Sequence, residues 1–229
     1  MIGYMIEQEL RNAAPAGHMI ATLLTQVLVA HDDPAFARPT KPIGPVYDAA
    51  ISRELAAQRG WAMAPDGNRW RRVVASPRPL RIIEAPVIEL LVANNVTVIC
   101  TGGGGIPVVQ HDDGTVAGVE AVIDKDLASA MLASELAADR LLFLTDVPGV
   151  YLDWGERPSR LVAKAGPGQL DPAHFPAGSM GPKVQAANEF VAATRGTAVI
   201  GQLEDAVLML RGEAGTTIDA SHHGLVVGS

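Results

Sequence analysis

Apolar residues change their spacing along the chain, and each change predicts an element. Between residues 2 and 13 they recur at helical spacing until Pro15 and Gly17 end the run, which predicts a helix at the start. Residues 19–30 are rich in β-branched and aliphatic side chains, which is typical of a buried strand.

After Pro86 the pattern alternates regularly between the helical and the extended period. The expected helices cover residues 87–94, 126–138, 183–194 and 204–210, the expected strands cover 96–100, 140–145, 197–201 and 216–219, and a hairpin turns through 112–114. Such alternation predicts an α/β fold with a mostly parallel sheet that helices cover on both faces.

Residues 34–79 interrupt this pattern because proline is frequent there. A short helix is expected near residues 47–59, followed by two β-like runs at 61–63 and 70–76 that the turn Pro65-Asp66-Gly67-Asn68 joins. We interpret the segment as a protruding subdomain, or lid, over a binding cleft. It is inserted in a single domain formed by residues 1–229.

Composition limits the function classes. Hydrophobic residues make up 48% of the 229 residues and charged residues 19%, which is typical of a soluble globular protein with a substantial core. The net charge of −7 argues against a general binder of nucleic acid or of anionic membranes. Any anionic ligand must therefore be held by local positive groups.

The single cysteine and the start of the chain indicate a cellular location. Cys100 has no partner for an internal disulfide and is most simply a small buried hydrophobic residue. The first ten residues lack the basic region of a leader peptide, and no stretch predicts a membrane span. The six histidines show no metal-ligand spacing, so no resident metal is expected. We expect a cytoplasmic protein.

Four consecutive glycines, Gly102, Gly103, Gly104 and Gly105, follow the strand expected at residues 96–100. Without Cβ atoms, the backbone amides at this strand end can approach a small anion closely. The alternative is a flexible tight turn. The segment is not a Walker loop, because no Gly-Lys-Ser/Thr follows it. It is not a Rossmann fingerprint either, because Pro107 rather than a helix comes next.

Lysine is scarce, and its positions are informative. The four lysines are Lys41, Lys125, Lys164 and Lys183, and all but Lys164 stand in segments rich in glycine or proline or at a helix start. Phosphoryl transfer needs positive charge against the oxygens of the moving group. In Asp124-Lys125-Asp126 the carboxylates are either ordinary helix caps or groups that orient lysines. Lys183 is either solvated or a ligand for an anion at a helix N-terminus.

Asp146 follows the strand expected at residues 140–145, and Tyr151 comes five residues later. The two residues are either an ordinary turn acid with a half-buried tyrosine or contacts to a nucleotide at the carboxyl end of a strand.

Six segments, taken together and in this order, resemble the carbamate kinases of the amino-acid kinase superfamily, and the resemblance covers essentially the whole chain. They are Thr40-Lys41-Pro42-Ile43-Gly44, Arg71-Arg72-Val73-Val74-Ala75-Ser76-Pro77, Gly102–Gly105 with Ile106-Pro107-Val108, Ala121-Val122-Ile123-Asp124-Lys125-Asp126, Leu144-Thr145-Asp146-Val147, and Gly178-Ser179-Met180-Gly181-Pro182-Lys183-Val184.

The resemblance implies a three-layer α/β/α sandwich and a reversible phosphoryl transfer in which carbamoyl phosphate and ADP give carbamate and ATP, usually in arginine metabolism. ATP or ADP would bind with Mg²⁺ carried by the nucleotide, and two copies would form a homodimer. Family members begin with a strand, a glycine turn, a helix, a second strand and a second glycine turn, and Met1-Ile2-Gly3-Tyr4 matches the family only where the following helix begins. We therefore expect the N-terminal strands to be missing and apolar faces to be left uncovered.

The resemblance also implies roles for individual residues. Catalytic residues would be Lys41, Lys125, Asp126 and Lys183, substrate-binding residues would be Gly102, Gly103, Gly104 and Gly105, and nucleotide-binding residues would be Asp146, Tyr151, Met180 and Lys183. In this scheme the lysines neutralise the transferring group and Asp126 holds them in place.

Two alternatives stay open. One is a chain without catalytic activity that serves as a structural or assembly partner. The other is a sister kinase that acts on a carboxylate such as acetylglutamate, against which the segment 40–44 and the cluster Asp124-Lys125-Asp126 argue.

Overall fold

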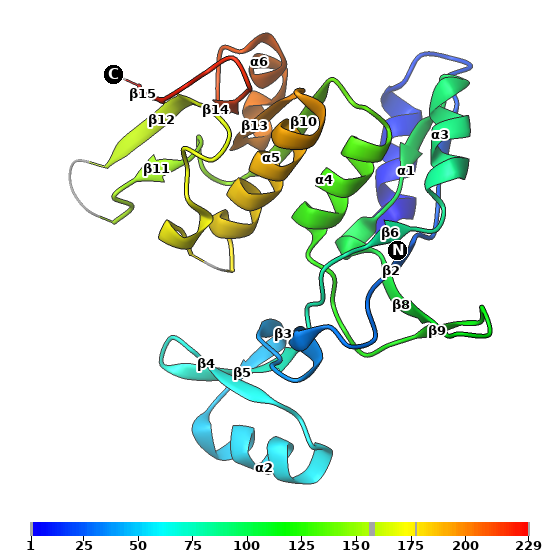
Figure 1. Ribbon diagram of the computed structural model, residues 1–229, viewed down its shortest axis with the longest axis vertical. Coiled ribbons are helices and arrows are strands. Elements are labelled where there is room, and N and C mark those ends of the chain that lie inside the picture. Colours follow the sequence, from blue (N-terminus) through cyan, green and yellow to red (C-terminus); the bar gives the residue numbers. More distant parts are fainter. Residues whose placement is uncertain (1, 156–158, 177, 229) are drawn as a thin grey trace. The chain divides into compact units, whose positions relative to one another are not determined.

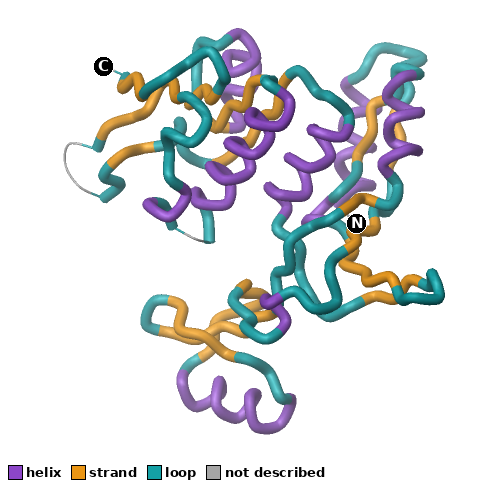
Figure 2. The backbone as a smooth tube through the Cα atoms, viewed as in Figure 1, coloured by secondary structure: helices purple, strands orange, loops and turns teal. Residues whose placement is uncertain are grey.

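A computed structural model describes residues 2–155, 159–176 and 178–228. The chain divides into two compact units, Met1–Ala128 and Ser129–Ser229 (Figure 1). Figure 2 marks the helices, strands and loops along the backbone. Within the described ranges, no helix combines the length and the apolar character that crossing a bilayer requires.

The N-terminal unit contains three complete helices and the start of a fourth among its described residues. The helices are α1 (Ile2–Ala13), α2 (Ala49–Arg59), α3 (Ala85–Ala93) and α4 (Lys125–Glu135), and the 3₁₀ turns are η1 (Pro34–Phe36) and η2 (Gly102–Gly104). The strands are β1 (Ile20–Thr22), β2 (Gln26–Leu28), β3 (Lys41–Tyr47), β4 (Met63–Asp66), β5 (Arg69–Val74), β6 (Arg81–Ile82), β7 (Thr97–Ile99), β8 (Ile106–Gln110) and β9 (Val116–Gly118).

Three sheets are built from these strands. Strands β1 and β7 pair in parallel, and β2 pairs in parallel with β8 inside the order β6-β2-β8-β9. The third sheet has the antiparallel order β3-β5-β4, and α2 packs against β5 (Figure 1). The segment expected to form a lid therefore has its own sheet and helix, while its role as a lid stays a prediction.

Helix α1 has the predicted bounds, and its apolar positions are exposed. The exposed fraction is 74% for Ile2 and 69% for Tyr4, as expected for an uncovered apolar face. Its polar face is attached to β1, because Thr22 donates a hydrogen bond to Glu7 at 2.7 Å.

The single buried strand predicted for residues 19–30 is wrong in one respect, because the structure has two strands there. Between β1 and β2 the chain bulges, so that Leu24 is 82% exposed and Thr25 turns inward. At this break Thr25 accepts a hydrogen bond from the backbone of Thr101 in another loop, and no local pattern predicts such a long-range contact.

Strand β3 was not predicted because Pro42 and Pro45 lie within it. Its pairing with β5 is irregular between Ile43 and Val46, which accommodates Pro45. The predicted hairpin is confirmed, but Pro65 and Asp66 belong to β4, so the strands are shifted from the expected runs. Helix α2 starts after Asp48, whose side chain accepts hydrogen bonds from two backbone amides.

The C-terminal unit contains a larger sheet. Its described elements are the end of α4, α5 (Met180–Thr194), α6 (Ala206–Arg211), the 3₁₀ turns η3 (Pro172–His174) and η4 (Leu203–Asp205), and the strands β10 (Arg140–Thr145), β11 (Tyr151–Leu152), β12 (Arg160–Ala165), β13 (Thr197–Gln202), β14 (Thr216–Ile218) and β15 (Leu225–Val227). The strand order is β10-β13-β14-β12-β11, and β15 also pairs with β12.

The core of this unit lies around β13. Its four residues from Ala198 to Gly201 are all buried, so both faces of the strand are covered, and α5 and α6 both contact β13 and β10. Strands β10–β13 and β12–β14 pair in parallel, and β13–β14, β11–β12 and β12–β15 pair antiparallel. The predicted α/β class is confirmed. The sheets are mixed rather than mostly parallel as expected, because antiparallel pairs outnumber the parallel ones among the described strands. The sequence pattern missed β11, β12 and β15.

Candidate functional site

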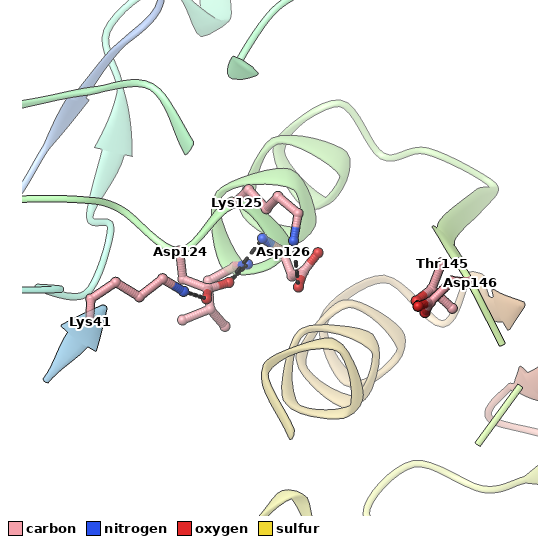
Figure 3. A network of polar contacts seen from close by, with 7 residues as sticks. Lys41, Asp124, Lys125, Asp126, Thr145 and Asp146 are labelled. Carbon is pink, nitrogen blue, oxygen red and sulfur yellow. Dashed lines mark hydrogen bonds and ion pairs between the residues drawn. The ribbon is translucent and has the colours of Figure 1, made fainter. Parts of the chain in front are cut away.

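An ion pair joins the start of β3 to the start of α4. Lys41 Nζ donates to Asp124 Oδ2 at 2.7 Å. The other oxygen of Asp124 accepts from the backbone N–H groups of Asp126 at 2.9 Å and Leu127 at 3.3 Å. The carboxylate therefore caps α4 and binds the lysine at the same time, as Figure 3 shows.

Asp124 is anionic at neutral pH although it is only 8% exposed. Burial by itself raises the pKa of Asp124. The hydrogen bond and the positive charge of Lys41, together with the two amide donors, outweigh burial, so the pKa is lower than usual. A fixed negative charge thus holds the Lys41 ammonium group in one place.

Asp126 contacts its neighbour in the sequence. Lys125 Nζ lies 3.4 Å from Asp126 Oδ2, with the lysine side chain 62% exposed and the aspartate side chain 9% exposed (Figure 3). Sequence reasoning gave the role of holding the lysines to Asp126, whereas the structure gives Lys41 to Asp124. Asp124 was missed as a site residue, although an aspartate directly before a helix is a recognisable capping signal.

The four-glycine turn has two different halves. A Cβ atom at Gly104 would lie 2.3 Å from the carbonyl oxygen of Ile123, and one at Gly105 would lie 2.6 Å from Val27 Cγ2, so packing requires both glycines. Gly102 and Gly103 have open space where a Cβ would be. The backbone of Gly102 and Gly103 is therefore open to a ligand.

Thr25 binds the backbone on both sides of the four-glycine turn. It is 3% exposed, its hydroxyl accepts from the backbone N–H of Thr101 at 2.8 Å, and its carbonyl accepts from Ile106 at 2.8 Å. Sequence reasoning missed Thr25, because a contact across 76 residues leaves no local pattern.

The Gly104→Ala substitution is expected to destabilise the protein by about 2–4 kcal/mol, because the new methyl group meets backbone and φ at Gly104 is +102°. The matched control is Gly103→Ala, where φ is +69° but space is open, with an expected loss of about 1 kcal/mol. Urea unfolding of both variants measures the difference. Equal losses would show that packing against Ile123 does not matter.

The C-terminal unit has a pocket at the ends of β10 and α5, with a volume of about 270 Å³. It is lined by Thr145, Asp146, Val147, Gly149, Tyr151, Trp154, Phe175, Pro176, Ser179, Met180 and Lys183. The rings of Tyr151 and Trp154 lie 5.4 Å apart at 59° to one another. Mostly apolar and aromatic walls with a few polar groups suit a heterocycle that carries charged groups.

All four residues predicted to bind a nucleotide, Asp146, Tyr151, Met180 and Lys183, line this pocket. Lys183 is in the first turns of α5 and is only 8% exposed, so the alternative interpretation of Lys183 as a solvated lysine is wrong. Thr145 donates a hydrogen bond to the Asp146 carboxylate at 3.1 Å.

A buried threonine fixes the backbone next to the pocket. The Thr216 hydroxyl accepts from the backbone N–H of Val150 at 2.8 Å and donates to the carbonyl of Val162 at 2.6 Å. These bonds fix the turn that follows β10 against β12 and β14. Thr216 is a second supporting residue that sequence reasoning missed.

Cys100 and metal binding complete the list of candidates. Cys100 is half-buried rather than fully buried as expected, and burial raises the pKa of its thiol, which agrees with an unreactive residue. Among the residues that the structure describes, no group of three or more His, Cys, Asp or Glu side chains is placed to hold a metal ion.

Comparisons with known proteins show the family to which the chain belongs. Residues 18–202 match the amino acid kinase family. Carbamate kinase from Rhizobium meliloti is 51% identical over 223 residues, which cover 96% of this chain and 69% of the relative. Carbamate kinase from Haemophilus influenzae is 48% identical, with 98% of this chain and 73% of the relative covered. The structure of carbamate kinase from Giardia lamblia bound to AMP-PNP has a TM-score of 0.84 and 43% identity over 95% of this chain and 72% of its own.

Proposed function

Because the chain belongs to the amino acid kinase family and is related to the carbamate kinases over nearly its whole length, we propose that it transfers a phosphoryl group reversibly between carbamoyl phosphate and ADP. The products are carbamate and ATP. Identity of 51% across 96% of the chain is the observation that carries this proposal.

The lysines would supply positive charge to the transferring group. Lys41 is held by Asp124, Lys125 lies beside Asp126, and Lys183 is buried where it lines the pocket of the C-terminal unit. Charge fixed before the reaction stabilises a developing negative transition state without reorganisation. The transfer would be direct and in line, without a covalent enzyme intermediate.

The other site residues would bind the substrates. Bare backbone at Gly102 and Gly103 would approach the carbamate or its phosphate, beside the packed glycines Gly104 and Gly105. The base of ATP or ADP would lie against Tyr151 and Trp154, and its phosphates would approach Lys183. Asp146 and Met180 would flank the nucleotide.

Mg²⁺ and a second copy of the chain remain proposals as well. The described residues offer no dedicated metal cage, so Mg²⁺ would arrive on the nucleotide phosphates. A homodimer is proposed from the family alone, and light scattering on the purified protein tests it.

The purified protein is expected to form ATP from carbamoyl phosphate and ADP with Mg²⁺, measured by a coupled luciferase assay. Omitting carbamoyl phosphate is the control, because it removes the phosphoryl donor. Phosphorylation of acetylglutamate by ATP, with no ATP formed from carbamoyl phosphate, would instead support the sister kinase.

A further inference from the structure

The segment 34–79 carries a second ion pair to the loop that precedes α4. Arg72 on β5 pairs with Glu120, and Lys41 on β3 pairs with Asp124. Lys41 lies opposite Val74 and Ile43 opposite Arg72, so Lys41 and Arg72 share one face of the antiparallel sheet. That face therefore sends two cations to carboxylates that are four residues apart.

A backbone contact lies between the two ion pairs. Ala75, just after β5, forms a parallel bridge with Ala121, and Val122 N–H donates to the carbonyl of Ala75 at 3.0 Å. In the loop before α4, the carboxylate Glu120 comes directly before this bridge and the carboxylate Asp124 comes after it. The β3–β5 sheet is thus held to residues 120–124 at three points.

An aromatic ring orders the arginine of the outer pair. The guanidinium carbon of Arg72 is 4.3 Å from the centroid of the Trp61 ring, and that of Arg59 is 5.0 Å away. The Arg72 side chain is 23% exposed, against 76% for Glu120. A stacked arginine has less rotamer freedom to lose, so this pair is better organised than most surface ion pairs.

We propose that Glu120 is a positioning residue for phosphoryl transfer. With Arg72 and Trp61 it forms a latch that keeps the β3–β5 sheet where Lys41 meets Asp124. The proposal rests on the proposed function, in which Lys41 acts on the transferring group. Releasing the latch lowers the fraction of molecules in which Lys41 is in place, and catalysis falls by that fraction.

The Glu120→Gln variant is expected to lower kcat about three- to tenfold and to leave KM for ADP within about twofold, since an organised surface pair contributes modestly. The KM is spared because every residue of the nucleotide pocket lies outside the latch. Glu120→Asp keeps the charge and is expected to retain most of kcat. Asp66→Asn is the matched control, because Asp66 pairs with Arg71 inside the same hairpin at 2.9 Å.

Hydrogen–deuterium exchange gives a readout that does not need activity. Peptides covering residues 40–47 should exchange several-fold faster in Glu120→Gln than in the wild type and in Asp66→Asn. Unchanged exchange and kcat in Glu120→Gln, or equal effects of Asp66→Asn, would overturn the latch. A wild-type protein that forms no ATP would defeat the proposed function, while the exchange data would still decide whether the latch exists.

Discussion

Replacing Lys183 by methionine is expected to lower kcat for ATP formation by about 10²–10³-fold, as the loss of one preorganised electrostatic stabiliser does in other enzymes. Lys183 is buried and lines the pocket, so its charge acts in a site with little screening by water. Methionine keeps an unbranched apolar side chain as far as Cε, with sulfur in place of Cδ, and lacks the ammonium group. Coupled ATP formation at saturating substrates measures the effect.

Lys164→Met is the matched control for this substitution. Lys164 is exposed on β12 and does not line the pocket, so kcat should stay within about twofold. Thermal unfolding of both variants separates a catalytic defect from a folding defect. A Lys183→Met variant that folds and turns over at the wild-type rate would remove Lys183 from the mechanism.

The elements that could be predicted from the sequence are those whose signals are local. Strand β10 begins and ends as predicted at Arg140 and Thr145, because an apolar run there is bounded by an arginine and an acidic turn. Helix α1 is likewise marked by its own apolar spacing and by Pro15. Both signals are complete within about a dozen residues.

The elements that were missed depend on contacts made far along the chain. Strand β12 is stable because β14 and β15 both pair with it, and these partners follow more than 50 residues later. Thr25 lies between β1 and β2, where its hydroxyl accepts a hydrogen bond from the backbone N–H of Thr101. Long-range pairing of this kind leaves no periodicity to detect.

The candidate site follows the same rule. Motif resemblance brought Lys41, Lys125 and Lys183 forward, and scarcity of lysine supported them. Which carboxylate holds Lys41 was decided by helix geometry, because the first residue of the cluster is the cap of α4 and is turned toward β3. Sequence spacing alone made the two aspartates equivalent.

Asp124→Asn is expected to lower kcat by about 10–100-fold and to destabilise the protein by about 1–3 kcal/mol. Asparagine retains an oxygen that can cap α4, so the cap is largely kept. What is lost is the negative charge of Asp124, which leaves the Lys41 ammonium group partly buried without its counter-ion. Lys41 is then free to leave the position that the proposed reaction requires, and Asp124 acts as a positioning residue through it.

The pH dependence of stability identifies this charge. The pKa of Asp124 is lower in the folded protein than in the unfolded chain, so its contribution is complete above about pH 4, the usual carboxyl pKa, and is lost as the pH falls through the folded value. The variant lacks this titration. The gap in unfolding free energy between wild type and Asp124→Asn should therefore be largest near pH 7 and should shrink toward pH 3.

Asp113→Asn is the control, because the pKa of Asp113 is also lowered, by hydrogen bonds from Thr115, on an exposed turn without a lysine partner at hand. It should lose stability with no change in kcat. A gap in unfolding free energy that stays constant for Asp124→Asn between pH 7 and pH 3 would mean that the ion pair between Asp124 and Lys41 contributes nothing to the fold.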